Sequence, residues 1–320
     1  MVGAQADRCG SPQAFPSMNN AKYRELWATV VTLSLALVGA FAPDAYLPML
    51  FRAFIVPLAL ALGLLAAAST LWRRWWLAQG ALLGVAILLI HVPVASVEQA
   101  GSGRTALRIF HMNVLQPNTA FAEAIAVARA SDADVISVQE VGAEWAEALL
   151  QGLVASHPYA HLEPRNNCYG IALFSKRPFQ KVELLEVEGT PFIEARIDMA
   201  GRSVRLLAVH ATSPISYEHF RRRNVQLELL GAHLACIEEA TILVGDLNTV
   251  PWDTAFARFC GRTGLRSTTR AFQRTWPALG PLAAIPLDHV LVSPEVGCAA
   301  LRTVHIPGSD HRGLLAELTL

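Results

Sequence analysis

The sequence predicts an α+β fold that is preceded by three transmembrane helices. Three observations lead to this expectation. Apolar runs of membrane-spanning length come first, strand-like segments outnumber helical ones after residue 101, and polar side chains recur where those strands end. Because hairpin-like runs dominate the second part, we expect a layered α+β arrangement rather than a doubly wound parallel sheet.

The apolar part of the chain lies near the N-terminus. Residues 26–97 contain only four charged residues. Three apolar runs occupy 26–42, 53–71 and 75–94, and each is 17 to 20 residues long, which is about the length that a helix needs to cross a bilayer. A secretory signal followed by a buried hairpin is the alternative. Three runs in succession, separated by short turns, favour membrane spans.

Basic residues around these runs predict their orientation. Lys22 and Arg24 precede the first run, and Arg73 and Arg74 separate the second from the third. Cytoplasmic loops are enriched in Lys and Arg, so these residues are expected inside the cell. The chain then divides into a cytoplasmic N-terminal segment, a three-helix transmembrane region, a linker and an extracytoplasmic domain, which are residues 1–25, 26–97, 98–104 and 105–320.

The charge balance of the extracytoplasmic part argues against a polyanionic partner. Residues 101–320 contain 20 Lys and Arg against 22 Asp and Glu, a net charge of −2. Nucleic-acid binding draws much of its affinity from basic side chains that release counterions. The charge therefore does not favour a nucleic-acid ligand, although it does not exclude one.

The elements after residue 101 follow from hydrophobic periodicity and turn residues. Helical periodicity predicts helices at Phe121–Ala130, Ala143–Leu153, 217–237 and 253–259. Apolar runs bounded by turn residues predict strands at 105–114, 132–141, 168–178, 181–189, 191–201, 203–214, 240–248, 285–293, 298–306 and 313–320.

Polar residues follow or interrupt six of these strands. They are Asn113, Gln139, Glu140, His210, Asp246, Asn248, Asp288, His289, Asp310 and His311. If the strand ends converge, these residues form one acidic, His-containing pocket. Its oxygen ligands suit a hard ion such as Mg²⁺ or Mn²⁺, which stabilises charge during attack on a phosphate. A His held by a carboxylate can move a proton. The sequence has no GxSxG elbow and no P-loop, which argues against acyl transfer and nucleotide-triphosphate motors.

A resemblance rests on an ordered set of motifs, HMNV, VQEV, YGIALFSKRP, VHATSP, GDLNTVPWD, PLDHVLVS and GSDHRG. In this order they resemble the endonuclease/exonuclease/phosphatase superfamily over roughly 104–320. The resemblance implies a four-layer α/β sandwich, with two mixed β-sheets flanked by helices, and Mg²⁺-dependent phosphoester cleavage. The apolar N-terminal part is similar to that of a membrane-anchored bacterial subgroup that includes a teicoplanin-resistance type.

The resemblance also implies roles for the polar residues. Glu140 looks like the principal metal ligand, with Asn113 and Asp310 as further metal-site residues. Asp246 looks like the residue that orients or deprotonates the attacking water, with Asn248 beside it. His210 would contact the phosphate or donate a proton. His311 resembles the terminal catalytic His, and Asp288 resembles the residue that orients it.

Two positions depart from the family pattern. Leu115 stands where some DNA-repair members carry a carboxylate, which argues against a second metal by that route. His289 stands where an aromatic residue is common, and it is either a substrate contact or a packed or solvated side chain. We treat His111 as structural because no partner for it is visible in the sequence.

The sequence therefore predicts a membrane-anchored, Mg²⁺-dependent phosphoester hydrolase that acts outside the cytoplasm. Its expected partners are the lipid bilayer and a phosphate-bearing substrate, with a lipid-linked phosphate or pyrophosphate favoured over nucleic acid. An extracytoplasmic nuclease and a catalytically inactive, membrane-anchored binding module are the alternatives. No sequence feature indicates a protein partner.

Overall fold

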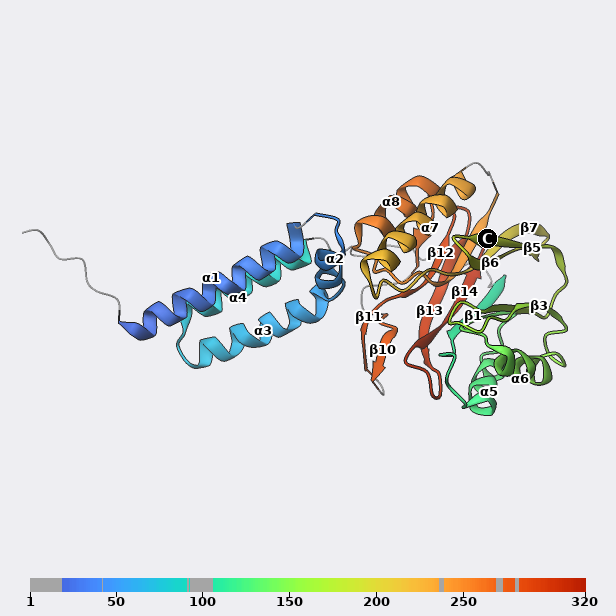
Figure 1. The fold of residues 1–320 in the computed structure, drawn as a ribbon, viewed down its shortest axis with the longest axis horizontal. Coiled ribbons are helices and arrows are strands. Elements are labelled where there is room, and N and C mark those ends of the chain that lie inside the picture. Colours follow the sequence, from blue (N-terminus) through green and yellow to red (C-terminus); the bar gives the residue numbers. More distant parts are fainter. Residues whose placement is uncertain are drawn as a thin grey trace, which may run out of the picture.

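A computed structural model describes residues 19–41, 43–90, 92, 106–235, 239–268, 273–279 and 282–320. The predicted linker 98–104 and most of the predicted N-terminal segment lie outside these residues. Figure 1 shows two parts, a helical region within residues 19–90 and a sheet domain that begins at residue 106.

The helical region contains four helices, α1 (Asn20–Phe41), α2 (Tyr46–Ala53), α3 (Ile55–Leu71) and α4 (Trp75–Leu89). Helix α4 packs against both α1 and α3, and the short helix α2 lies where the helices meet the sheet domain (Figure 1). The chain bends by 58° between α2 and α3. Pro57 accounts for the bend, because its ring would clash with the carbonyl group four residues earlier in a continuous helix.

The helix lengths correct the expectation of three membrane-spanning helices. Among the described residues, α1 is the one helix that is long and apolar enough to cross a membrane. The bent pair α2 and α3 would count as a second span only if the two are taken together, and α4 has 15 residues. The predicted second run is therefore broken at Phe54, and the helix in the third run ends at Leu89.

The helices pack through small residues and turn large apolar side chains outward. Small residues, among them Ala36, Ala78 and Ala81, are buried between the helices, whereas Trp27, Leu64 and Trp76 are each more than 60% exposed. A Cβ at Gly80 would lie 2.4 Å from the Thr29 side chain, so the close approach of α1 and α4 depends on this glycine.

The sheet domain contains two six-stranded mixed sheets and a separate hairpin. The first sheet has the order β13-β14-β1-β2-β4-β3, with strands Gly297–His305, Arg312–Thr319, Leu107–Asn113, Val135–Gln139, Ile171–Ser175 and Tyr159–Glu163. The second has the order β5-β6-β7-β8-β12-β9, with strands Phe179–Val187, Thr190–Met199, Arg202–His210, Thr241–Asp246, Asp288–Val292 and Arg266–Ser267. The hairpin pairs β10 (Trp276–Leu279) with β11 (Leu282–Ile285).

These elements form four layers, as the family resemblance implies. One apolar core lies between the sheets and takes residues such as Ile109 and Leu314 from the first sheet and Val244 and Val290 from the second. Helices α5 (Phe121–Ala130) and α6 (Ala143–Leu153) cover the outer face of the first sheet. Helices α7 (Tyr217–Ala235) and α8 (Thr254–Thr263) cover the outer face of the second.

Some of these strands are not evident from the sequence pattern. Strand β3, strand β9 and the β10–β11 hairpin were not expected. The predicted strands 105–114, 132–141 and 240–248 do form β1, β2 and β8. The predicted short helix is α8, and Asp253 caps it by accepting a hydrogen bond from the Ala255 backbone at 2.8 Å.

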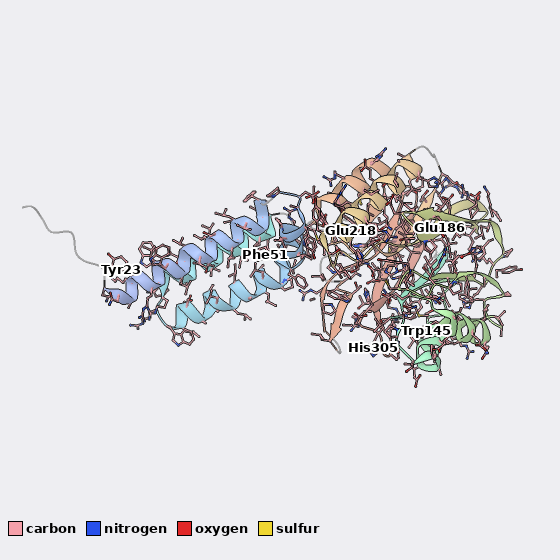
Figure 2. The ribbon with its side chains drawn as sticks, viewed as in Figure 1. Tyr23, Phe51, Trp145, Glu186, Glu218 and His305 are labelled. Carbon is pink, nitrogen blue, oxygen red and sulfur yellow. The ribbon has the colours of Figure 1, made fainter. Side chains whose placement is uncertain are left out.

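Polar and apolar contacts join the helical region to the sheet domain. The Arg52 guanidinium donates to Thr254 Oγ1 at 2.9 Å, and the Trp252 indole donates to the Arg52 carbonyl at 2.8 Å. Arg258 pairs with Asp44 at 2.7 Å. Apolar residues of both parts share one buried cluster. Figure 2 shows Phe51 close to this junction and Tyr23 at the opposite end of the helices.

Candidate active site

The polar residues predicted from strand ends extend the inner faces of the two sheets. Successive side chains of a strand point to opposite faces, so Asn113 shares the face of Ile109, and Asp246 shares the face of Val244. The strand pairings place Asn113 opposite Gln139, His210 opposite Asp246, and Asp288 opposite Asp246. The apolar core between the sheets therefore ends in a buried polar cluster at one edge.

Asp288 lies at the base of this cluster and holds two imidazole rings. Its Oδ2 is 2.9 Å from His311 Nδ1, and its Oδ1 is 2.7 Å from His111 Nε2. All three side chains are buried. Burial alone would raise the pKa of Asp288, but the charge of His311 and the hydrogen bonds from His111 and His311 hold it well below its usual range.

His311 presents its other nitrogen to Asp246. His311 Nε2 is 3.7 Å from Asp246 Oδ2. Burial would lower the pKa of His311, but the carboxylates of Asp288 and Asp246 outweigh it and raise the pKa to about 10. The surroundings therefore favour the charged form of the ring, which is hydrogen-bonded to Asp288 and faces Asp246.

Asp246 is fixed by the backbone around it. Its Oδ1 accepts a hydrogen bond from the Asn248 backbone at 2.8 Å, and its own backbone N–H donates to Gln139 Oε1 at 2.9 Å. The preceding Gly245 has φ 152°, and a Cβ there would lie 1.8 Å from the Val209 carbonyl oxygen. Burial, followed by the charge of Asp288, raises the pKa of Asp246 to about 8.

Glu140 and Asn113 form a second polar pair beside Asp246. The Asn113 amide donates to Glu140 Oε1 at 2.9 Å and lies 3.4 Å from Asp246 Oδ2. The Gln116 backbone donates to Glu140 Oε2 at 3.0 Å. Glu140 itself has φ 64°, a left-handed conformation that non-glycine residues rarely adopt. Such strain concentrates at functional sites, where surrounding contacts hold it in place.

His210 and Asn248 complete the side of the cluster next to Asp246. His210 Nε2 is 3.8 Å from Asp246 Oδ2, and the ring centroid is 5.7 Å from that of Tyr169. Burial, and then the charge of His311, lowers the pKa of His210 to about 3, so this ring is neutral. The Asn248 amide donates to the Ala211 carbonyl at 2.9 Å.

Asp310 reaches the cluster from the loop before β14. Its Oδ2 accepts a hydrogen bond from the Trp276 indole at 2.9 Å, while its Oδ1 is buried without a hydrogen-bond partner. Ser309 ties this loop to β1, because its hydroxyl donates to the Asn113 carbonyl at 2.8 Å. Asp310 therefore offers one free carboxylate oxygen.

Two groups of side chains could hold a metal ion. Ligand atoms of Asp246, Asp288 and His311 lie within 4.8 Å of one another. However, Asp288 already uses one oxygen for each imidazole, so an ion there would have to displace those hydrogen bonds. The alternative is the predicted set, Asn113, Glu140 and Asp310. Asp310 has an unused buried oxygen, whereas both Glu140 oxygens and Asn113 Oδ1 each accept one hydrogen bond from an amide N–H. This set is made of oxygen donors, which fits a hard ion such as Mg²⁺.

A cavity of about 490 Å³ opens over these residues. Its lining includes six predicted site residues, Glu140, His210, Asp246, Asn248, Asp310 and His311. Asn113 and Asp288 support these residues through hydrogen bonds. The opposite lining is apolar and includes Tyr46, Met49, Leu50, Ala53 and Phe54 from the α2 segment.

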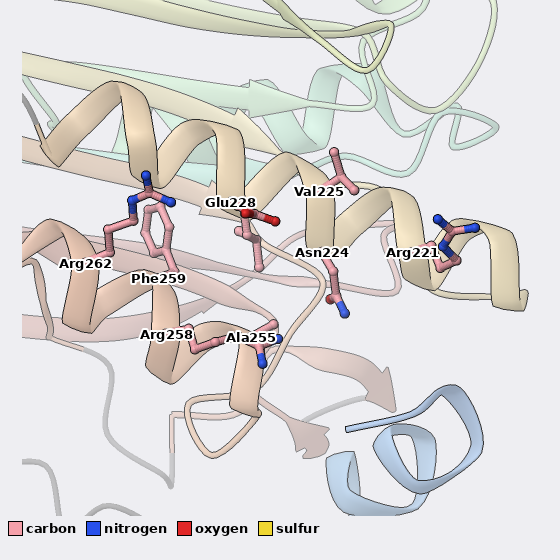
Figure 3. Close-up of a pocket in the computed structure, with 9 residues that line it drawn as sticks. Arg221, Asn224, Val225, Glu228, Ala255, Arg258, Phe259 and Arg262 are labelled. Atoms are coloured by element: carbon pink, nitrogen blue, oxygen red, sulfur yellow. The ribbon is translucent and has the colours of Figure 1, made fainter. Parts of the chain in front are cut away.

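A second hollow, of about 580 Å³, lies between α7 and α8 (Figure 3). It is lined by Arg221, Asn224, Val225, Leu227, Glu228, Ala255, Arg258, Phe259 and Arg262. It contains none of the strand-end residues, so we do not treat it as the catalytic candidate.

The structure separates one predicted residue from the site and adds another. His289 is packed rather than exposed to a substrate: its Nε2 donates to the Thr249 carbonyl at 2.8 Å, and its ring stacks near Phe256. Burial lowers the pKa of His289 to about 4. His111, which the sequence analysis treats as structural, is the second partner of Asp288. Its place on the inner face of β1, two residues before Asn113, is the signal that could have revealed it.

Comparisons with known proteins agree with this architecture. The model of the Endonuclease/Exonuclease/phosphatase family matches residues 110–311. No curated protein is similar enough in sequence to count as a relative.

Three solved structures show the fold. Humanized D. rerio TDP2 is 17% identical, with a TM-score of 0.57 over 67% of this chain and 99% of its own. Sphingomyelinase C from Streptomyces griseocarneus is 18% identical, with a TM-score of 0.51 over 66% of this chain and 98% of its own. A Staphylococcus aureus beta toxin mutant with bound magnesium ions is 16% identical, with a TM-score of 0.53 over 67% of this chain and 99% of its own.

Proposed function

Because the chain belongs to the endonuclease/exonuclease/phosphatase family, we propose that it is a membrane-anchored, metal-dependent phosphoester hydrolase that acts on a lipid-linked phosphate or pyrophosphate. The observation that carries the hydrolase assignment is the buried chain Asp288–His311–Asp246, which faces a cavity that Glu140 and Asp310 also line.

Asn113, Glu140 and Asp310 would hold the ion, Mg²⁺ or Mn²⁺. The ion would neutralise phosphate charge and stabilise the charge that develops as the phosphoester bond breaks. The unused oxygen of Asp310 and the carboxylate of Glu140, held by the Asn113 amide and the Gln116 backbone, support this assignment.

The remaining residues would position the nucleophile and stabilise charge. Asp246 is fixed by backbone hydrogen bonds and would orient and deprotonate the attacking water. A nearby cation lowers a carboxyl pKa, so the raised pKa of Asp246 would fall when the site is loaded. His311, charged because Asp288 and Asp246 flank it, would stabilise negative charge on the phosphate. His210 would contact the phosphate as a neutral donor, beside Asn248.

Membrane anchoring is supported by the packing of the helical region. Large apolar side chains face outward and small residues lie between the helices, a pattern typical of helices in lipid. The start of α1 and the α3–α4 turn lie at the same end, because Arg74 is 3.9 Å from Glu25. The four basic flanking residues are therefore grouped at the end remote from the sheet domain. With this end in the cytoplasm, the sheet domain would lie outside.

The substrate preference is supported by charge and by the lining of the cavity. The net charge of −2 for residues 101–320 offers little of the counterion release that drives nucleic-acid binding. The apolar residues of α2 in the cavity wall suit a hydrocarbon rather than a polyanion. The intact acidic and His set argues against an inactive binding module.

A substrate panel tests the proposal. The full-length protein, purified in detergent with Mg²⁺, is assayed against prenyl pyrophosphates, phospholipids in mixed micelles, and single- and double-stranded DNA. We expect hydrolysis of at least one lipid phosphate and little cleavage of DNA. Rapid DNA degradation without lipid hydrolysis would favour the nuclease alternative. Inactivity on every substrate would favour the binding module.

A further inference from the structure

Part of the apolar wall of the catalytic cavity comes from the helical region, beside apolar residues of the sheet domain such as Ile215, Val250 and Leu287. Tyr46, Met49, Leu50, Ala53 and Phe54 all line the same cavity as Glu140, Asp246 and His311. These two groups are about 90 to 260 residues apart in the sequence. The cavity therefore combines polar residues at the strand ends with an apolar wall to which α2 and the adjoining Phe54 contribute.

This wall is held in place by specific contacts. Arg52, on the same helix, binds Thr254 through its guanidinium and Trp252 through its carbonyl. Ile55 and Val56, just beyond the bend, are buried in one cluster with Val250, Ile285 and Leu287. The position of α2 beside the cavity is thus fixed by the hydrogen bonds of Arg52 and by the apolar contacts of Ile55 and Val56 just after the helix.

Of the five wall residues, Met49 is buried and the other four remain partly open. Leu50 is half-buried, and Phe54 is 39% exposed although it lines the cavity. Ile215, which also lines the cavity, is 73% exposed. Apolar side chains left open beside a polar site indicate a ligand that carries both kinds of surface.

We propose that α2 forms the subsite for the hydrocarbon chain of a lipid phosphate, with Leu50 and Phe54 as the specificity-determining residues. The phosphate would lie against Glu140, Asp246 and His311, and the chain would leave the cavity along α2. Because α2 continues into α3, which carries exposed apolar residues such as Leu60 and Leu64, the chain would pass from the cavity towards the bilayer. This inference rests on the proposed function and deepens it, since it assigns chain selectivity to the helical region.

Helix α2 offers a matched pair of variants. Leu50 lines the cavity, whereas Leu47 lies on the same helix, is 71% exposed and does not line it. Leu50→Gln and Leu47→Gln therefore make the same chemical change on the same helix, inside and outside the proposed subsite. Phe54→Ala is a second variant in the subsite, at a side chain whose exposure makes its removal tolerable for folding.

The experiment measures chain-length selectivity of the full-length protein in mixed micelles at a fixed mole fraction of substrate. The probes are dimethylallyl, geranyl and farnesyl pyrophosphate, and dihexanoyl and dioleoyl phosphatidylglycerol. For the series that is hydrolysed, we expect the wild type to have a higher kcat/KM on the longer chain. Leu50→Gln and Phe54→Ala should each lower the ratio of long-chain to short-chain kcat/KM about tenfold, and Leu47→Gln should leave it at the wild-type value.

Each other outcome is decisive. An equal loss on short and long chains in the Leu50 and Phe54 variants would mean a structural role and would overturn the inference. An unchanged ratio of long-chain to short-chain kcat/KM in both variants would also overturn the inference. In that case the hydrolysis of lipid substrates would still support the proposed function. Hydrolysis of neither series would overturn the proposed function, and this inference with it.

Discussion

Asp288 binds two imidazoles, and their surroundings decide which one can act on a substrate. His111 is fully buried and its second nitrogen has no hydrogen-bond partner, so it can only hold the carboxylate. His311 lines the cavity and turns its second nitrogen towards Asp246. His111 is therefore a positioning residue, and His311 is the one placed to meet a phosphate.

This difference predicts the effect of removing His311 or the carboxylate it faces. His311→Ala and Asp246→Asn should each lower kcat by about 10²-fold or more, because one removes a cation that stabilises the phosphate charge and the other removes the base. His305→Ala is the matched control, because His305 is exposed on β13. Steady-state kinetics on the best substrate, with circular dichroism to check folding, measures this. Wild-type turnover in His311→Ala would refute the catalytic assignment.

The pKa of His311 also predicts how stability depends on pH. The folded state raises this pKa from 6.5 to about 10, so the folded protein holds the proton more tightly than the unfolded chain. The stability from this ion pair is fully present below pH 6.5, and it is lost as the pH rises to about 10. In EDTA, the Tm difference between wild type and His311→Asn should therefore shrink as the pH rises from 6.5 to about 10. A difference that stays constant or grows would contradict the charge state proposed for His311.

The residues of the site were largely predictable, but their partners were not. Strand-end Asn, Asp, Glu and His residues, together with the motif resemblance, identify the residues that the structure gathers around one cavity. The pairing of His111 was missed because Asp288 is 177 residues away; the position of His111 two residues before Asn113 indicates the face of β1 that it shares but not its partner. His289 was left open because its hydrogen bond to Thr249 depends on the tertiary packing of a loop.

Among the secondary-structure elements, the last turn-facing residues of β8 depend on one glycine, Gly245, which lies inside this strand next to Asp246. Gly245 has φ 152°, and a Cβ would meet the Val209 carbonyl at 1.8 Å and Gln139 Nε2 at 2.5 Å. Gly245→Ala should therefore destabilise the protein by about 3 kcal/mol, because the backbone that places Asp246 would have to move. Thermal denaturation in detergent measures the loss.

The control for this prediction is another glycine with positive φ. Gly201 has φ 84° in the turn between β6 and β7, and a Cβ there would contact nothing within 4 Å. Gly201→Ala should cost only the conformational strain, about 1 kcal/mol. Equal Tm losses in the two variants would contradict the prediction, because they would show that the steric contact at Gly245 does not cause the loss of stability.

Long apolar runs predicted their elements well, and short or half-exposed segments did not. Strands β1, β2 and β8 are buried along their length and appear in the sequence as apolar runs. Strand β3 is exposed or half-exposed throughout, and β10 has Pro277 at its second position. The bend that separates α2 from α3 follows from Pro57, but the placement of α2 against the cavity depends on contacts some 200 residues apart, such as the 202-residue separation of Arg52 and Thr254.

At the scale of the molecule, the grouping of basic residues predicts a topology. Lys22, Arg24, Arg73 and Arg74 flank the helices at the end remote from the sheet domain. A reporter enzyme that works only in the exported compartment should therefore be active when it is fused after Leu320. A matched fusion to a reporter that works only in the cytoplasm should be inactive. The opposite pattern would place the sheet domain in the cytoplasm and contradict the orientation.

Metal-dependent phosphoester hydrolysis is proposed to take place in the cavity over the strand ends of the two sheets. The most direct measurement titrates Mg²⁺ into EDTA-treated full-length protein and follows hydrolysis by wild type, Glu140→Gln and the exposed control Glu147→Gln. The account predicts no turnover in EDTA and recovery with Mg²⁺ in wild type and Glu147→Gln. Glu140→Gln should need more Mg²⁺ and turn over at least about 10²-fold more slowly, because it loses one anionic ligand. Full activity in EDTA, or a Glu140→Gln titration that matches wild type, would contradict the account.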